Sequence, residues 1–219
     1  MNFYFPTVLA ILGVGLGIDI PHICDKIIAY KNRKKNIEIA SIRSDGAIMS
    51  SLFILVNGVL WAFAGLGLEN TLIALLVSLL FTVAILILLI DLRIRLIPNE
   101  LVLIMFCLGL AFQIIYYGWS ALLPALICMV VVGGIFIIVG GLVGLNQVGA
   151  GDVKLAAVMG LTLGYPNITI ALIAMSIALL AFCFSGLLIK KLTIHSTFAL
   201  APFMMLGTIS ALLYLVIKA

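Results

Sequence analysis

Long apolar runs separated by short polar clusters dominate this chain. No Asp, Glu, Lys or Arg occurs in residues 1–18, 46–68, 70–90, 101–151, 155–189 and 192–217. About 20 apolar residues in a helix cross the roughly 30 Å hydrocarbon core of a bilayer, because each residue adds about 1.5 Å. The pattern therefore predicts an all-α, polytopic membrane protein.

Two of the apolar runs are too long for one helix, since residues 101–151 alone would reach about 76 Å at helical rise. Each contains a turn signal, Tyr-Gly-Trp-Ser at 117–120 and Gly-Tyr-Pro-Asn at 164–167. Gly, Pro, Ser and Asn interrupt helices, and Trp and Tyr suit the membrane interface. We therefore predict eight transmembrane helices, near residues 3–23, 46–67, 71–90, 100–117, 121–144, 153–164, 168–189 and 198–217.

The composition agrees with this pattern and excludes a water-soluble globule. Only 9% of the residues are charged and 65% are hydrophobic, whereas an average soluble domain has about 25% charged residues. The net charge of +4 does not predict nucleic-acid binding, because in a membrane protein the position of the cations matters more than their sum. The four cysteines are far apart and form no C-x-x-C pair, so we predict packing roles, with no metal site and no cofactor.

The basic residues predict the orientation of the helices, because cytoplasmic loops are enriched in Lys and Arg. With eight crossings, 11 of the 12 basic residues fall on one side, and only Lys218 falls on the other. We therefore expect a single membrane domain over residues 1–219 with both termini on the non-cytoplasmic side. Residues 24–45 hold six of the cations and are predicted to form a basic cytoplasmic loop that contacts anionic lipid headgroups.

Two of the eight acidic residues need a functional explanation. Asp91 follows an uninterrupted apolar helix, and Asp152 follows 51 residues without a charge. Ionisable groups at such positions are costly unless they are paired or face a polar cavity, so they are functional candidates. The predicted topology places both carboxylates at the cytoplasmic ends of their helices, where they can meet.

Two neighbouring carboxylates favour the chemistry of aspartic proteases. They cannot both ionise easily, so they share a proton, and one can act as a base on water while the other acts as an acid. The helix that begins at Asp152 favours its charged form, which makes Asp91 the better choice for the protonated partner. Pro98 after Asp91 can end one helix and start the next, and Gly149 and Gly151 allow close backbone approach.

The residues around both aspartates resemble motifs of the type IV prepilin peptidases. The sequence from Asp91 to Asn99, DLRIRLIPN, resembles the first active-site motif of that family. GAGDVKL, from Gly149 to Leu155, is similar to the second motif, which has the form Gly-x-Gly-Asp followed by a hydrophobic residue and lysine. A later segment around Pro202, Phe203 and Gly207 matches a third family pattern in part. The resemblance thus points to these site residues besides the two aspartates: Ile97, Pro98, Asn99, Gly149, Gly151 and Lys154.

The resemblance implies an aspartic endopeptidase of the bacterial inner membrane. Its substrates would be prepilin or pseudopilin precursors, whose short basic leader is removed at the cytoplasmic face. Asp91 and Asp152 match the two catalytic aspartates of the family, and the cleavage needs no cofactor.

Two departures from the family pattern carry further expectations. Many members have two C-x-x-C pairs between their first two helices and also methylate the new amino terminus. This chain has a short segment there without a cysteine pair, so we expect neither a zinc site nor N-methyltransferase activity. Asp19 replaces part of an amino-terminal family pattern and is a possible accessory residue of the site.

Three other interpretations remain open from the sequence. A G-x-G-D intramembrane protease of other substrates would use the same two acids for the same chemistry. A proton-coupled carrier would use them to bind protons, although carriers place such acids near the bilayer midplane. An inactive relative could serve as an assembly subunit.

Overall fold

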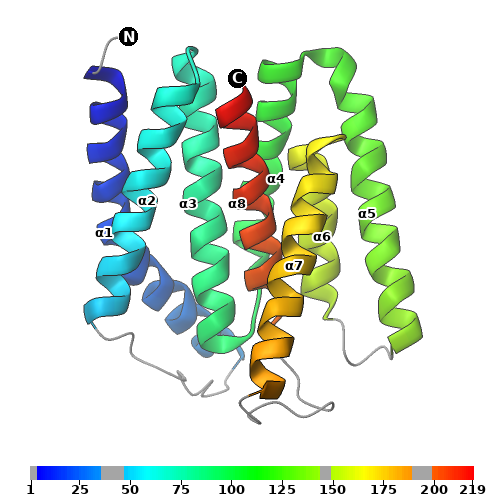
Figure 1. The fold of residues 1–219 in the computed structure, drawn as a ribbon. Coiled ribbons are helices and arrows are strands. Elements are labelled where there is room, and N and C mark those ends of the chain that lie inside the picture. The colour runs from blue at the N-terminus through cyan, green and yellow to red at the C-terminus, as the bar shows by residue number, and fades with distance from the viewer. Residues whose placement is uncertain (1–3, 36–46, 144–148, 189–198) are drawn as a thin grey trace.

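Eight α-helices form the bundle seen in this computed structural model, which describes residues 4–35, 47–143, 149–188 and 199–219 (Figure 1). No strand occurs in those ranges. A π-helical turn, Gln113–Tyr117, extends α4, and a 3-10 turn, Trp119–Ala121, precedes α5. The helices are α1 Tyr4–Lys35, α2 Ala47–Gly67, α3 Thr71–Ile94, α4 Asn99–Phe112, α5 Leu122–Val143, α6 Ala150–Leu163, α7 Asn167–Leu188 and α8 Ala201–Lys218.

Successive helices run in opposite directions, so the chain begins and ends at the same end of the bundle (Figure 1). We call the opposite end, at the bottom of Figure 1, the site end. Six helices of the described residues are long and apolar enough to cross a membrane, namely α1, α3, α4 with its π turn, α5, α7 and α8. α2 has 21 residues, of which Ser51–Gly67 form an apolar stretch, and α6 has only 14 residues. The chain is therefore an all-α, multi-pass membrane protein, and the eight helices of its described residues lie near the eight predicted ranges.

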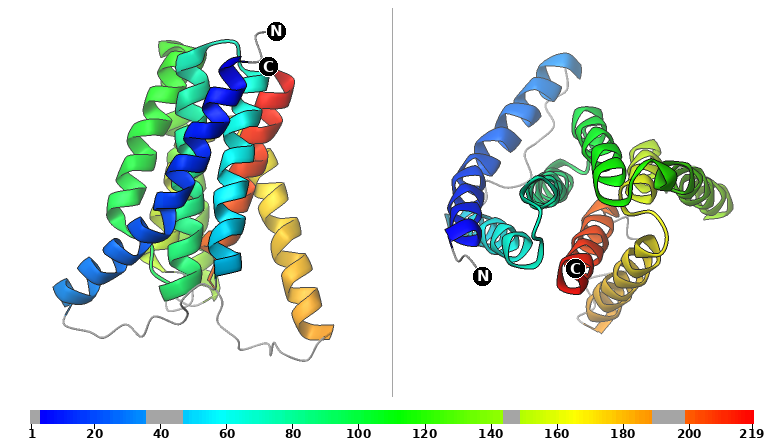
Figure 2. Two further views of the ribbon diagram at one scale, coloured as in Figure 1. Left: turned by 90° about the vertical axis from the view of Figure 1, so that its left-hand side faces the viewer. Right: turned by 90° about the horizontal axis from the view of Figure 1, so that it is seen from above.

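The first helix continues beyond its predicted end at residue 23. It reaches Lys35, so residues 24–35 of the expected loop are helical, and residues 36–46 lie outside the described ranges. The helix continues because it has a buried apolar face, in which Ile20, Cys24 and Ile28 follow one another at intervals of four residues. Pro21 lies inside this helix, and beyond it the helix bends away from the line of its membrane span (Figure 2).

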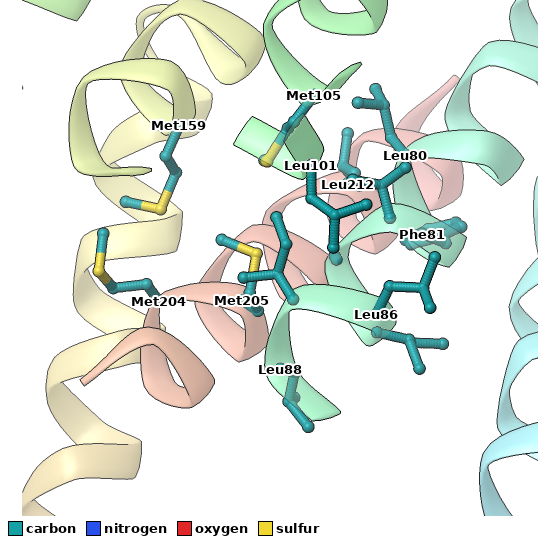
Figure 3. Close-up of a cluster of buried hydrophobic side chains, with 14 of the residues drawn as sticks. Leu80, Phe81, Leu86, Leu88, Leu101, Met105, Met159, Met204, Met205 and Leu212 are labelled. Carbon is teal, nitrogen blue, oxygen red and sulfur yellow. The ribbon is translucent and has the colours of Figure 1, made fainter. Parts of the chain in front are cut away.

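The core surrounds α3, which is buried along almost its whole length from Ala74 to Ile94. Side chains of α4 and α8 pack against it, and α6 packs against α4 and α8 (Figure 3). The two sequence motifs lie on α3, α4 and α6, so this packing fixes the relative positions of the motif ends. Labelled members of this cluster are Leu80, Phe81, Leu86, Leu88, Leu101, Met105, Met159, Met204, Met205 and Leu212.

The far end of α6 lies lower in the bundle than the corresponding ends of α4, α5 and α8 (Figure 1). Backbone carbonyls at such an end need partners, because the surroundings offer little water. The buried Gln113 supplies them, since its Nε2 donates to the carbonyl oxygens of Leu161 and Thr162 at 3.0 Å each. Gly164, with φ of 60°, then turns the chain. Both predicted turns, at 117–120 and 164–167, are confirmed by the helix boundaries.

A buried polar network joins α1, α2 and α3 on the other side of the bundle. Asn57 Nδ2 donates to the carbonyl oxygen of Gly13 at 2.7 Å, and Thr82 Oγ1 donates to Asn57 Oδ1 at 3.0 Å. Trp61 Nε1 donates in turn to Thr82 Oγ1 at 2.9 Å. Gly13 and Gly17 let α2 approach α1 closely, because a Cβ at either position would lie within 3.0 Å of an α2 atom.

Candidate active site

Asp91 lies in the last turn of α3, at the site end of the bundle. Arg95 ends this helix in the left-handed conformation, with φ of 50° and ψ of 43°, and its N–H donates to the Asp91 carbonyl oxygen at 2.9 Å. Pro98 then caps the start of α4, as the sequence predicts. The first motif is therefore a tight connection between two helices.

Asp152 lies in the first turn of α6, which is not one of the six spans. Its Oδ2 accepts a hydrogen bond from the N–H of Gly149 at 3.2 Å, and its own N–H donates to the Gly149 carbonyl oxygen at 3.0 Å. Burial raises the pKa of the Asp152 carboxyl, and the Gly149 N–H opposes this shift. The second motif thus presents a partly desolvated acid at a helix amino terminus.

The two motifs pack directly against each other. A Cβ at Gly151 would lie 3.3 Å from Ile97 Cβ, so the glycine allows this close contact. Lys154 Nζ donates to Asn99 Oδ1 at 3.4 Å. Between them lies a cavity of about 300 Å³, and its lining residues are Lys31, Asp91, Arg95, Leu96, Ile97, Asn99, Gly149, Gly151 and Asp152.

The Asp91 side chain is only 5% exposed, although it borders this cavity. Its carboxylate accepts a hydrogen bond from the Ala201 N–H, at the start of α8, and it is close enough to Asp152 for the two charges to repel. Its Oδ2 is buried and has no hydrogen-bond partner within the described part of the chain. A buried acceptor without a partner is costly, and native proteins retain such groups mainly where they have a chemical role.

Most of the residues expected from the motifs reach the cavity. Both aspartates, Ile97, Asn99, Gly149 and Gly151 line it, while Pro98 and Lys154 hold neighbouring positions. Asp19 does not line it and lies exposed on α1.

Four contributions to the site were missed from the sequence: Lys31, Arg95, Leu96 and the Ala201 N–H. Lys31 was assigned to the basic loop and Arg95 was counted only among the cations that orient the helices, although Lys31 continues the buried period of Ile20, Cys24 and Ile28 by a further three residues. That period was the signal that could have found Lys31.

The two carboxylates at the cavity are groups that can act in acid–base chemistry. Among the described residues, no group of three or more His, Cys, Asp or Glu side chains could hold a metal ion. Two carboxylates and a cavity large enough for water and part of a peptide chain are the reactive features at the site end.

Comparison with known protein families supports the assignment that the motifs suggest. A family model described as the type IV leader peptidase family matches residues 78–217, which is more than half of the chain. Comparison with curated proteins and with solved structures gave no significant match. The matched residues contain both motifs, both aspartates and the segment that begins α8. The chain therefore belongs to the type IV leader peptidase family.

Proposed function

We propose that this protein is an aspartic endopeptidase that removes the basic leader from type IV prepilin or pseudopilin precursors. The observation that carries the proposal is that Asp91 and Asp152 line the same cavity. In this proposal the site end faces the cytoplasm of a bacterium, because the cations cluster at the same ends of the helices.

The two carboxylates have different surroundings, which suggests their roles. Asp152 borders the cavity at a helix amino terminus and accepts the Gly149 N–H, so it is the better ionised base. It takes a proton from water as the water oxygen bonds to the scissile carbonyl carbon. Asp91, the more deeply buried partner, carries the shared proton and delivers it as the C–N bond breaks. A hydroxyl group thus ends on the carbonyl carbon and a proton on the amine, and the pair titrates as one unit.

The position of the acids also separates this proposal from a proton-coupled carrier. Asp91 lies in the last turn of α3 and Asp152 in the first turn of α6, whereas carriers bind ions near the bilayer midplane on broken helices. An acid pair at one end of the bundle suits a peptide bond that lies just outside the apolar helix of a substrate.

A cleavage assay in liposomes tests the proposal. The substrate is a peptide with a basic leader, a glycine and an apolar helix, and the variants are Asp91→Asn, Asp152→Asn and the double variant. Each single substitution is expected to lower kcat by about 10³-fold or more, and the double variant is expected to be no worse, because the two groups act as a unit. Glu69→Gln is the matched control, since Glu69 is exposed in the turn between α2 and α3.

Other outcomes of this assay would refute different parts of the proposal. Full cleavage by either aspartate variant would refute the dyad. Proton flux without cleavage by the wild type would favour the carrier. Mass spectrometry of the product after incubation with S-adenosylmethionine tests the expected lack of methylation, and an added methyl group would contradict it.

A further inference from the structure

The part of α1 beyond its bend, residues 21–35, forms an arm at the site end. Figures 1 and 2 show that this arm leaves the line of the membrane span and passes alongside the end of α3 that carries Asp91. The arm lies outside the matched residues 78–217. One of its residues, Lys31, nevertheless lines the cavity together with both aspartates.

Two ion pairs attach the arm to the helices on either side of the first motif. Asp25 Oδ1 lies 2.7 Å from Arg93 Nη1 in the last turn of α3. Lys31 Nζ lies 2.8 Å from Glu100 Oε1 in the first turn of α4. The arm therefore bonds to both ends of the connection that runs through residues 95–99.

The position of the cation distinguishes the two pairs. The Lys31 and Glu100 side chains are 12% and 53% exposed, and those of Arg93 and Asp25 are 8% and 68% exposed. Each pair therefore joins a largely buried cation to an exposed acid and contributes little by itself, but of the two cations Lys31 lines the cavity. Lys31 is thus a long side chain, held at its tip by Glu100, that also forms one wall of the cavity.

We propose that the arm of α1 is a clamp on the first motif, and that Lys31 is a positioning residue that acts through Glu100. It holds the connection at residues 95–99, and with it Asp91, in register with Asp152. This inference rests on the proposed function for its kinetic effect, although the clamp itself is a structural claim. A displacement of about 1 Å in a catalytic group can lower the rate about 100-fold, so a small movement of the connection would lower kcat measurably.

The test compares four variants in liposomes or detergent. Lys31→Met removes the ion pair, Lys31→Arg keeps it, and the double variant Lys31→Glu with Glu100→Lys reverses it. Lys26→Met is the matched control, because Lys26 is exposed on the same arm and has no ion pair among the described residues. Two readouts are measured, kcat and KM for the leader peptide, and hydrogen–deuterium exchange of residues 92–100 with α7 as an internal reference.

The clamp predicts one set of results. Lys31→Met lowers kcat by about 10- to 100-fold, leaves KM within about twofold, and speeds exchange of residues 92–100 but not of α7. Lys31→Arg and the charge-reversed pair restore both readouts, and Lys26→Met matches the wild type. Wild-type exchange and wild-type kcat in Lys31→Met would overturn the proposal. So would rescue by Lys31→Arg alone, because the ammonium would then act directly on the substrate.

The exchange readout keeps this inference separate from the proposed function. If the wild type cleaves no leader peptide, but Lys31→Met speeds exchange and the reversed pair restores it, the clamp stands and the peptidase proposal fails. If the wild type cleaves the peptide and neither readout responds to Lys31→Met, the clamp fails and the peptidase proposal stands. If neither cleavage nor a change in exchange is observed, both are refuted.

Discussion

The contact between α5 and α6 gives the sharpest test of how Asp152 is held. A Cβ on Gly160 in α6 would lie 2.7 Å from the carbonyl oxygen of Cys128 in α5, and 3.2 Å from Met129 Cα. The first distance is 0.7 Å shorter than the 3.4 Å at which ordinary contact begins. The atoms that it meets are backbone, so no side-chain rotation can relieve the clash. Gly160→Ala must therefore push the two helices apart.

The size of the effect follows from two opposing contributions. Overpacking of this kind costs about 1–3 kcal/mol, and alanine recovers about 0.5–1 kcal/mol of helix propensity. Gly134→Ala is the matched control, because Gly134 is also helical and a Cβ there would meet nothing within 4 Å. The control should gain the propensity without the clash. The two variants are thus expected to differ by about 2 kcal/mol in free energy of unfolding, or roughly 30-fold in equilibrium constant.

Equilibrium unfolding in mixed detergent micelles, followed by circular dichroism, measures this difference. Cleavage of the leader peptide gives a second readout, because Asp152 lies about 12 Å along the same helix from Gly160 and a shifted α6 would misplace it. We expect Gly160→Ala to lower both stability and kcat. Equal stability of the two alanine variants would show that α5 and α6 do not approach as closely as the structure has them.

Two further predictions concern buried polar groups. Asn57→Leu removes the centre of the network between α1, α2 and α3 and should lower the free energy of unfolding by about 1 kcal/mol, measured by the same unfolding assay. Ser210→Ala is the control, because Ser210 is exposed, and it should change the free energy of unfolding by less than about 0.5 kcal/mol. A loss as small as that of the control would contradict this role for Asn57. Burial raises the pKa of Asp152, so its charge opposes folding at neutral pH, and Asp152→Asn should raise the unfolding temperature at pH 7. The gain should shrink as the pH falls through the raised folded-state pKa and should vanish below about 4, where the wild-type carboxyl is neutral in both states. A wild type that is the more stable at pH 7 would contradict the sign.

The helices and the two acids could be predicted from the sequence because charge is so scarce. Each apolar run is bounded by charges or by a turn, so the expected boundaries lie within a few residues of most helix ends. Asp91 and Asp152 stood out for the same reason, since every other acid lies in a more polar stretch or nearer an end of the chain.

Contacts between helices were harder to predict, because hydropathy says little about which polar groups meet. The helical residues 24–35 carry several charges and were assigned to a loop, although Ile20, Cys24 and Ile28 mark a continuous buried face. The bond from the Ala201 N–H to Asp91 joins residues far apart in sequence and depends on how α8 packs against α3. The length of α6 was close to the prediction, but the role of Gln113 at its end appeared only in three dimensions.

The shortness of α6 determines what sets the depth of Asp152 in the membrane. At 14 residues the helix spans about 21 Å, less than the hydrocarbon thickness of roughly 30 Å. Its apolar residues from Leu155 to Leu163 are nearly all buried, and its far end is held by Gln113. The depth of Asp152 is thus set by neighbouring helices and not by lipid headgroups. The spacing of the two acids is therefore expected to be the same in thin and thick bilayers, even where the outer helices tilt to match the lipid.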